Sequence, residues 1–236
     1  MYRNLSFLLF ALFLFAGLSA DAQLNKDFGH WYTLGFGKDI NERWDVSVYQ
    51  ELRTENNGTS IGRTFTQFAV DYEVQRWFRL GLNYRFILNK RSDESFGHRH
   101  RIMGDVQFRK YHQRWRFIYR NRTQWEVRTW NYTREYGFSP AWDNRNTIKI
   151  DYRINRKFRP FCSFDLRFLL RDARIPGVTD IDRTRFVGGV DIDLPGYRRF
   201  SLFVLLSRNW NIPEPDQIFV VGAEFSFGSA RPAIMN

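Results

Sequence analysis

Apolar and polar residues alternate with a period of two along most of the chain, across residues 44–227. In one segment, for example, the apolar Leu82 and Tyr84 flank the polar Asn83. A helix would bring residues three and four positions apart onto one face, and here every face would then mix arginine with phenylalanine. The pattern therefore predicts β-strands with one apolar face and one charged face.

The alternation recurs in eleven segments, of which the first covers residues 28–37. Because single-chain bacterial barrels contain an even number of strands, we predict ten or twelve strands. The odd number of segments then means either that a twelfth strand shows no clear alternation or that the first segment lies outside the barrel wall. The predicted fold is all-β, a single closed antiparallel transmembrane β-barrel.

The connections between the segments alternate in length. Short polar turns are expected at residues 39–43, 75–76, 112–114, 155–157 and 195–198, and longer connections at 55–62, 91–97, 129–142, 172–180 and 211–216. Outer-membrane barrels have short periplasmic turns and longer outer loops. A water-soluble sandwich or lipocalin-like barrel would match the period of two, but it gives no reason for this alternation of lengths.

The apolar positions are bulky and often aromatic, which suits an outward face in contact with lipid. Two aromatic belts are predicted. The belt beside the short turns would contain Trp44, Trp77, Tyr111, Trp115 and Tyr197, and the belt beside the long connections Trp125, Trp130, Trp142 and Trp210.

The first residues have the features of a secretory signal peptide. Arg3 precedes an uncharged apolar run that extends to Ala20, and small residues close the segment at Ala22. A transmembrane anchor is the alternative, but the run is shorter than the roughly 18 residues such a helix needs. We therefore predict a signal peptide at residues 1–22 and an outer-membrane β-barrel domain at 23–236, located in the cell outer membrane.

The chain carries a formal net charge of +11, and Arg3 and Asp21 cancel when the signal peptide leaves. Nucleic acid is not the expected partner, because the chain is exported and its arginines are spread over many segments. The expected partners are outer-membrane lipids and lipopolysaccharide, with the barrel-assembly machinery acting during biogenesis. Cys162 is the only cysteine, so no intrachain disulfide forms, and we interpret it as a small apolar wall residue.

Charged residues occupy the face opposite the apolar one and are predicted to line the lumen. The candidates are Arg85, Arg101, Arg109, Arg120, Arg122, Glu126, Arg128, Asp151, Arg153, Asp165 and Arg167. One interpretation is a network of ion pairs that fills a narrow barrel. The other is a narrow pathway for anionic solutes, because rings of arginine select anions in pores.

An enzyme acting on lipid or lipopolysaccharide is the alternative from another class. Its candidates are Ser95, His98 and His100, at the point where a strand leaves a long loop, with Asp93 and Glu94 nearby. The serine lacks the context of a nucleophile elbow, so no catalytic residue is assigned. A metal site made of His98, His100 and His112 is not expected, because His112 lies in a turn at the opposite end of the same predicted strand. No cofactor is expected either, since the sequence contains no phosphate-binding glycine loop and no CxxC pair.

The segments at residues 115–128 and 144–153 resemble the DUF2490 family of outer-membrane β-barrel proteins. The N-terminal part is similar too, through Gly29-His30-Trp31, Trp44-Asp45-Val46-Ser47-Val48 and Glu51-Leu52-Arg53, and so is the inward row Arg120, Arg122, Glu126 and Arg128. The resemblance covers nearly the whole chain after residue 22. It implies the barrel architecture and brings no activity with it.

Overall fold

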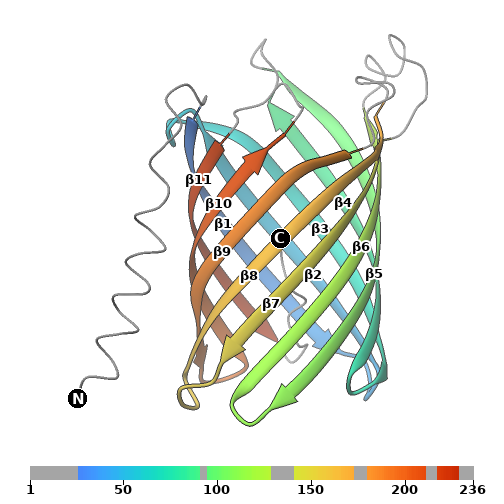
Figure 1. Cartoon of the computed structure of the whole chain (residues 1–236), viewed down its shortest axis with the longest axis vertical. Helices are drawn as coiled ribbons and strands as arrows, with labels where there is room; N and C mark the ends of the chain where they lie inside the picture. The colour runs from blue at the N-terminus through green and yellow to red at the C-terminus, as the bar shows by residue number, and fades with distance from the viewer. Residues whose placement is uncertain (1–25, 91–94, 129–140, 173–179, 211–216, 229–236) are drawn as a thin grey trace.

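The computed structural model describes residues 26–90, 95–128, 141–172, 180–210 and 217–228, which form eleven tilted strands around a closed barrel (Figure 1). The strands are β1 Lys26–Asp39, β2 Trp44–Glu55, β3 Ser60–Gln75, β4 Phe78–Lys90, β5 Phe96–His112, β6 Trp115–Arg128, β7 Ala141–Tyr152, β8 Phe158–Arg171, β9 Asp180–Leu194, β10 Arg198–Asn209 and β11 Gln217–Gly228. None of the described residues forms a helix that is long and apolar enough to cross a membrane.

Each strand pairs in antiparallel fashion with the next, and the barrel closes through a parallel pairing of β1 with β11. This seam runs from Lys26 opposite Gln217 to Gly37 opposite Gly228. With an odd number of strands the first and last strands must point the same way, and a parallel ladder satisfies their backbone groups. The predicted count of ten or twelve strands is therefore wrong, and the first segment belongs to the wall.

Inward and outward side chains alternate along each strand, as the period of two predicts. In β6, Arg120 and Arg122 are 1% and 2% exposed and face the interior, whereas Phe117 and Tyr119 are 41% and 40% exposed and face outward. Cys162 is also exposed on the outer face, on β8.

The two ends of the barrel differ in their connections. At one end, here called the short-turn end, residues 40–43, 76–77, 113–114, 153–157 and 195–197 join the strands. At the other, the long-connection end, the connections are 56–59, 91–95, 129–140, 172–179 and 210–216. The connection after β2 is shorter than predicted, because Asn56, Asn57 and Gly58 adopt left-handed backbone conformations and form a compact turn.

Aromatic side chains are exposed on the outer face next to the short turns. Trp44 packs on Tyr72 with ring centroids 4.7 Å apart, and Trp115 packs on Tyr152 at the same distance. Trp142 and Trp210 are exposed near the other end. The predicted signal peptide, Trp130, the side chain of Arg128, Asp93, Glu94 and the connection at 211–216 lie outside the described residues.

The barrel interior is apolar on one side, which the prediction of a charged lumen missed. Trp31, Val187, Phe203, Leu205 and Val220 form a buried cluster across β9, β10, β11 and β1. This group, here called the seam cluster, covers the inner side of the parallel seam. Burying it contributes hydrophobic stabilisation where the ladder is slightly weaker per residue.

Glycines in the wall make room for inward-facing rings. A Cβ atom on Gly222 would lie 2.1 Å from Cζ of Phe203, and one on Gly189 would lie 2.8 Å from Cζ of Phe161. At these two positions any larger residue would collide with a ring that fills the interior. Gly188 differs, since a Cβ there would meet nothing within 4 Å.

Candidate functional site

A layer of buried polar side chains crosses the middle of the barrel. Arg122 on β6 lies directly opposite Asp105 on β5, and its Nε and Nη2 atoms donate to the two carboxylate oxygens at 2.6 and 2.5 Å. Asn83 Nδ2 donates to the same carboxylate at 3.2 Å. Because a guanidinium and a carboxylate match in this bidentate arrangement, the pair fixes both side chains.

A second polar group continues this layer across β6, β7 and β8. Arg145 Nη2 and Thr147 Oγ1 each donate to Asp165, at 2.5 Å in both cases. Arg120 Nη2 in turn donates to Thr147 Oγ1 at 3.3 Å. The residues are neighbours because Thr147 lies opposite Arg120 in one ladder and opposite Asp165 in the next.

Two cavities lie on either side of this layer and share no lining residue. The cavity at the short-turn end, the lower cavity, has a volume of about 410 Å³. The cavity towards the long-connection end, the upper cavity, measures about 80 Å³. The side chains of the layer between them are almost fully buried: Asn83 and Thr147 are 2% and 1% exposed. Met103, whose Sδ atom accepts a bond from Arg122 Nη1 at 3.5 Å, is 0% exposed. The described interior is thus divided rather than open from end to end.

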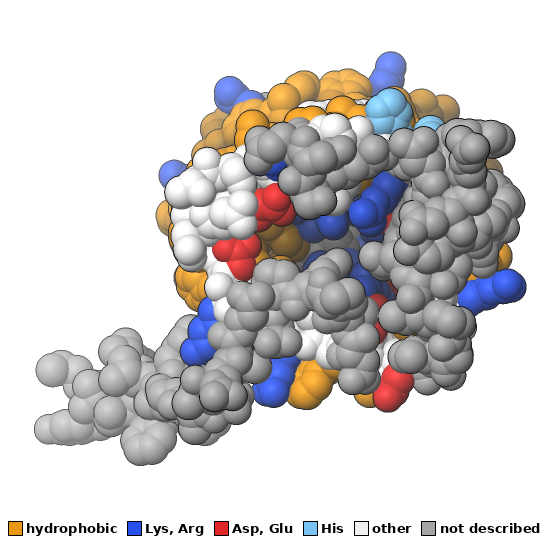
Figure 2. All heavy atoms as spheres, turned by 90° about the horizontal axis from the view of Figure 1, so that it is seen from above, with side chains coloured by type: hydrophobic (Ala, Val, Ile, Leu, Met, Phe, Trp, Pro, Cys, Tyr) orange, Lys and Arg blue, Asp and Glu red, His pale blue; other side chains and the backbone are white. Residues whose placement is uncertain are grey.

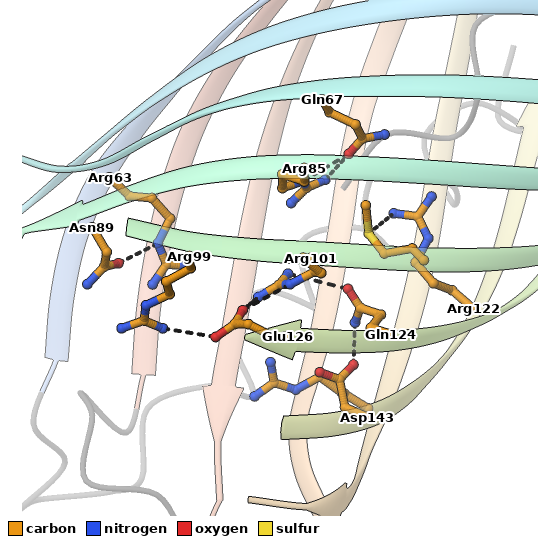
Figure 3. Close-up of polar contacts among 12 residues, drawn as sticks. Arg63, Gln67, Arg85, Asn89, Arg99, Arg101, Arg122, Gln124, Glu126 and Asp143 are labelled. Carbon is orange, nitrogen blue, oxygen red and sulfur yellow. Dashed lines mark hydrogen bonds and ion pairs between the residues drawn. The ribbon is translucent and has the colours of Figure 1, made fainter. Parts of the chain in front are cut away.

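The upper cavity is strongly cationic. Nine arginines line it against five carboxylates, and Lys and Arg side chains are visible in the mouth of the barrel (Figure 2). Some of the arginines are paired: Arg101 contacts Glu126 and also donates to Gln124 at 3.3 Å, and Gln124 contacts Asp143 (Figure 3). The excess of guanidinium groups leaves a net positive charge around the cavity.

Some of these arginines also contact aromatic rings, and Arg53 is in addition paired with the buried carboxylate of Glu51. Arg53 lies 3.6 Å from the ring centroid of Trp31, and Arg85 lies 3.8 Å from that of Phe65. Arg185 is 8% exposed, and its Nε atom has no hydrogen-bond partner among the described residues. A buried guanidinium with an unused donor is unfavourable unless an anion or water binds it.

Several basic side chains of the lower cavity are paired with carboxylates. Arg109 donates to Glu73 at 2.8 Å, Arg116 to Asp151 at 2.7 Å, and Arg199 to Asp193 at 2.7 Å, which neutralises most of the positive charge. Lys149 lies 3.8 Å from Asp191 and also 3.8 Å from the ring centroid of Phe161. Among the residues that line this cavity, six basic side chains face three carboxylates, and pairing with Glu73 and Asp151, which lie outside the lining, reduces the excess.

Glu224 on β11 also lines the lower cavity, and no described residue forms a hydrogen bond or ion pair with its carboxylate. Glu224→Gln is expected to raise the free energy of unfolding by about 1 kcal/mol, because it removes an unpaired charge from the interior. Asp151→Asn is the matched control and should lower it, since Asp151 is paired with Arg116. Urea titration of the refolded barrel measures both. A destabilised Glu224→Gln variant would mean that the carboxylate has a favourable partner.

The structure places most of the predicted lumen residues inside the barrel. Buried there are Arg85, Arg109, Arg120, Arg122, Glu126, Asp151 and Asp165, and Arg101 and Arg167 are partly buried. Arg153 instead is exposed in the turn after β7, so its predicted position in the lumen needs correction. The alternation continued past the end of β7 at Tyr152 and placed Arg153 in the strand.

Asp143 and Arg145 in β7 were missed as interior residues. Both are buried, and both take part in the polar contacts described above. The outward neighbours of Arg145 are Asn144 and Asn146, so the apolar half of the alternation is absent there. The apolar alternation in β7 begins only at Ile148. The neighbouring strands β6 and β8 continue for several more residues toward the long-connection end, so a β7 of matching length would have included Asp143 and Arg145.

The histidines considered for catalysis face the outside of β5. His98 and His100 are exposed, and His100 Nδ1 lies 2.8 Å from the hydroxyl of Tyr84. Both imidazoles pack near the ring of Phe86. Ser95 precedes the strand and is exposed. No group of three metal-ligating side chains lies together among the residues described.

A closed barrel with an apolar outer face, aromatic residues near both ends and a largely polar interior has the architecture of outer-membrane β-barrels. The chain belongs to the DUF2490 family, described as a protein of unknown function, whose model matches residues 28–217. No curated protein matches the sequence.

Several solved structures share the fold. The NanC porin is 14% identical with a TM-score of 0.51, and the match covers 82% of this chain and 93% of the porin. A bacterial polysaccharide outer-membrane secretin is 15% identical with a TM-score of 0.49, and the match covers 79% of this chain and 62% of the secretin's length. LpxR from Salmonella typhimurium is 8% identical with a TM-score of 0.47, covering 78% and 83% of the two chains. At these identities the likeness concerns the fold alone.

Proposed function

We propose that this protein spans the outer membrane and binds anionic solutes in its upper cavity. The observation that carries the proposal is the buried Arg185, whose Nε atom lacks a described partner in a cavity where nine arginines face five carboxylates. Anions with two or more oxygen atoms match the fork of a guanidinium group. Because the two cavities are separate, we infer binding in a closed barrel rather than free passage.

The outer face supports the placement in a membrane. Bulky apolar side chains cover it between the aromatic residues near the two ends, which is how barrels meet lipid. Residues 1–22 would act as the signal peptide, and the barrel-assembly machinery would insert the chain. With the short turns in the periplasm, the long connections would face the cell exterior.

Lipids are the proposed partners of the outer face. Basic residues are exposed at the short-turn end beside the aromatic side chains, and only two exposed acidic residues, Asp39 and Glu42, accompany them in the described turns and strand ends. The basic residues are Lys38, Arg43, Arg76, Lys110, Arg114, Arg153, Arg156, Lys157 and Arg198. Anionic lipid headgroups complement such a rim. Lipopolysaccharide would contact the opposite end.

Isothermal titration of the purified barrel with citrate tests the binding proposal. Citrate should bind, and Arg185→Gln should weaken its affinity by roughly tenfold or more, because a hydrogen bond to a charged group is lost. Arg76→Gln, in an exposed turn at the other end, is the control and should leave the affinity unchanged.

Two results would contradict the proposal. One is the absence of citrate binding to folded protein, and the other is equal affinity in the Arg185→Gln variant. Recordings in planar bilayers address the closed interior separately. A steady anion-selective conductance would show an open conduit instead of a binding site.

A further inference from the structure

A group of polar side chains lies on the outer face of the barrel, near the middle of β6 and β7. Asn121 and Thr123 on β6 lie opposite Asn146 and Asn144 on β7, and all four face outward. Gly104 on β5 is opposite Thr123, and a Cβ atom there would meet nothing within 4 Å. These five residues, here called the asparagine patch, form a polar area on the outer face.

Hydrogen bonds connect the side chains of the patch to one another. Asn121 Nδ2 donates to Asn144 Oδ1 at 3.0 Å and to Asn146 Oδ1 at 2.9 Å. Asn144 Nδ2 donates to Asn121 Oδ1 at 3.1 Å and to Thr123 Oγ1 at 3.1 Å. Asn146 Nδ2 donates to Asn144 Oδ1 at 2.9 Å, and the hydroxyl of Tyr119 donates to Asn146 Oδ1 at 2.7 Å. The amides therefore hold a fixed arrangement.

Some hydrogen-bonding capacity is left over within this arrangement. Asn146 Nδ2 carries two hydrogens and makes one bond among the described residues, and Asn121 Oδ1 can accept two bonds and accepts one. The Thr123 hydroxyl accepts a bond and donates none to a described residue. In hydrocarbon these groups would have no water to satisfy them, and each would be costly.

The unused donor and acceptor complement each other across a two-fold axis. If two copies meet through this patch, Asn146 of each copy can donate to Asn121 of the other, as an isologous interface requires. The missing side chain at Gly104 lets the two walls approach closely. Small residues and amide side chains join transmembrane helices, where the hydrophobic effect gives little drive, and the same physical argument applies to two barrel walls in lipid.

We propose that the asparagine patch is the contact surface between two copies of this chain, which associate side by side in the membrane. The proposal rests on the proposed placement in the membrane and is independent of anion binding. We infer that the partner is a second copy because the patch carries both an unused donor and an unused acceptor. Two identical patches can therefore satisfy each other.

Cysteine cross-linking in native membranes tests the contact. The parent protein carries Cys162→Ser, and Gly104→Cys introduces a thiol at the patch without a clash. Val204→Cys is the matched control, since Val204 also faces outward, on β10. A short bis-maleimide should produce a dimer band with Gly104→Cys and little with Val204→Cys. Equal yields at both positions would indicate random collisions and would overturn the proposal.

Replacing the unused groups tests the chemistry of the contact. Asn121→Leu together with Asn146→Leu should weaken dimerisation in detergent by roughly tenfold, because the amide hydrogen bonds between the two copies are lost. Sedimentation equilibrium in density-matched micelles measures the change. The proposal would be overturned if the wild-type protein were monomeric in micelles and Gly104→Cys gave no cross-linked dimer. It would also be overturned if Gly104→Cys became cross-linked to a different protein.

The heat-dependent mobility of the barrel on a gel reports whether the protein is folded. It therefore distinguishes failure of the membrane placement from failure of the proposed contact. A protein that never shows the folded, membrane-inserted form would contradict the membrane placement itself. A folded and inserted protein without a dimer would contradict only the contact through the asparagine patch.

Discussion

Replacing Arg122 by methionine is expected to lower the free energy of unfolding by about 3–5 kcal/mol, the range found when one partner of a buried ion pair is removed. Asp105 would then keep its charge in the middle of the barrel with only Asn83 as a described hydrogen-bond donor. Both members of the pair are buried, at 2% and 8% exposure, so water cannot readily replace the guanidinium.

The double variant Arg122→Met, Asp105→Leu should recover most of the lost stability, because it removes both charges and fills a similar volume. Arg76→Gln, in an exposed turn, should change the free energy by no more than about 0.5 kcal/mol. Urea unfolding in lipid vesicles, followed by tryptophan fluorescence, measures all three variants. If Arg122→Met unfolded at the same urea concentration as the parent, the layer of paired side chains would not stabilise the barrel.

Gly222→Val is expected to destabilise the barrel by about 3 kcal/mol or more, at the upper end of the range for overpacked cores. The ring of Phe203 lies over this glycine, and a Cβ atom would come within 2.1, 2.4 and 2.6 Å of its Cζ, Cε2 and Cε1 atoms. Because Phe203 belongs to the seam cluster, its ring has little free space to move into.

Gly188→Val is the matched control, since it adds the same side chain at a strand position where a Cβ would meet nothing within 4 Å. Valine favours strands, so this variant should be neutral or slightly stabilising. Phe203→Leu in the Gly222→Val background should restore part of the stability by removing the clashing ring atoms. Equal losses at Gly188 and Gly222 would show that glycine matters for the backbone and not for the ring.

The strands could be predicted from the sequence because each residue of the wall faces either the apolar outer side or the largely polar interior. Where lipid-type residues such as Phe117 and Tyr119 alternate with Arg120, the period of two is clear. The number of strands could not be predicted from the observed regularity of even counts. A barrel needs only that every backbone group be paired, and the parallel ladder of β1 with β11 meets that need as well.

The interior was harder to predict than the wall. In β10 the residues from Phe200 to Leu206 are apolar apart from Ser201, so alternation could not show that Phe203 and Leu205 face inward. Ion pairs depend on register and on side-chain reach, which the sequence of a single strand does not contain. Arg101 and Glu126 meet because they lie opposite each other in the β5–β6 ladder.

The seam between β1 and β11 joins the two most distant parts of the folded chain, so its closure carries the largest loop entropy and should come last in assembly. Until then the inner faces of Trp31 and Val220 have no complete set of neighbours, and both strand edges remain open. Burial of these apolar side chains at the last step stabilises the closed barrel relative to the open sheet. Closure therefore does not depend on a disulfide.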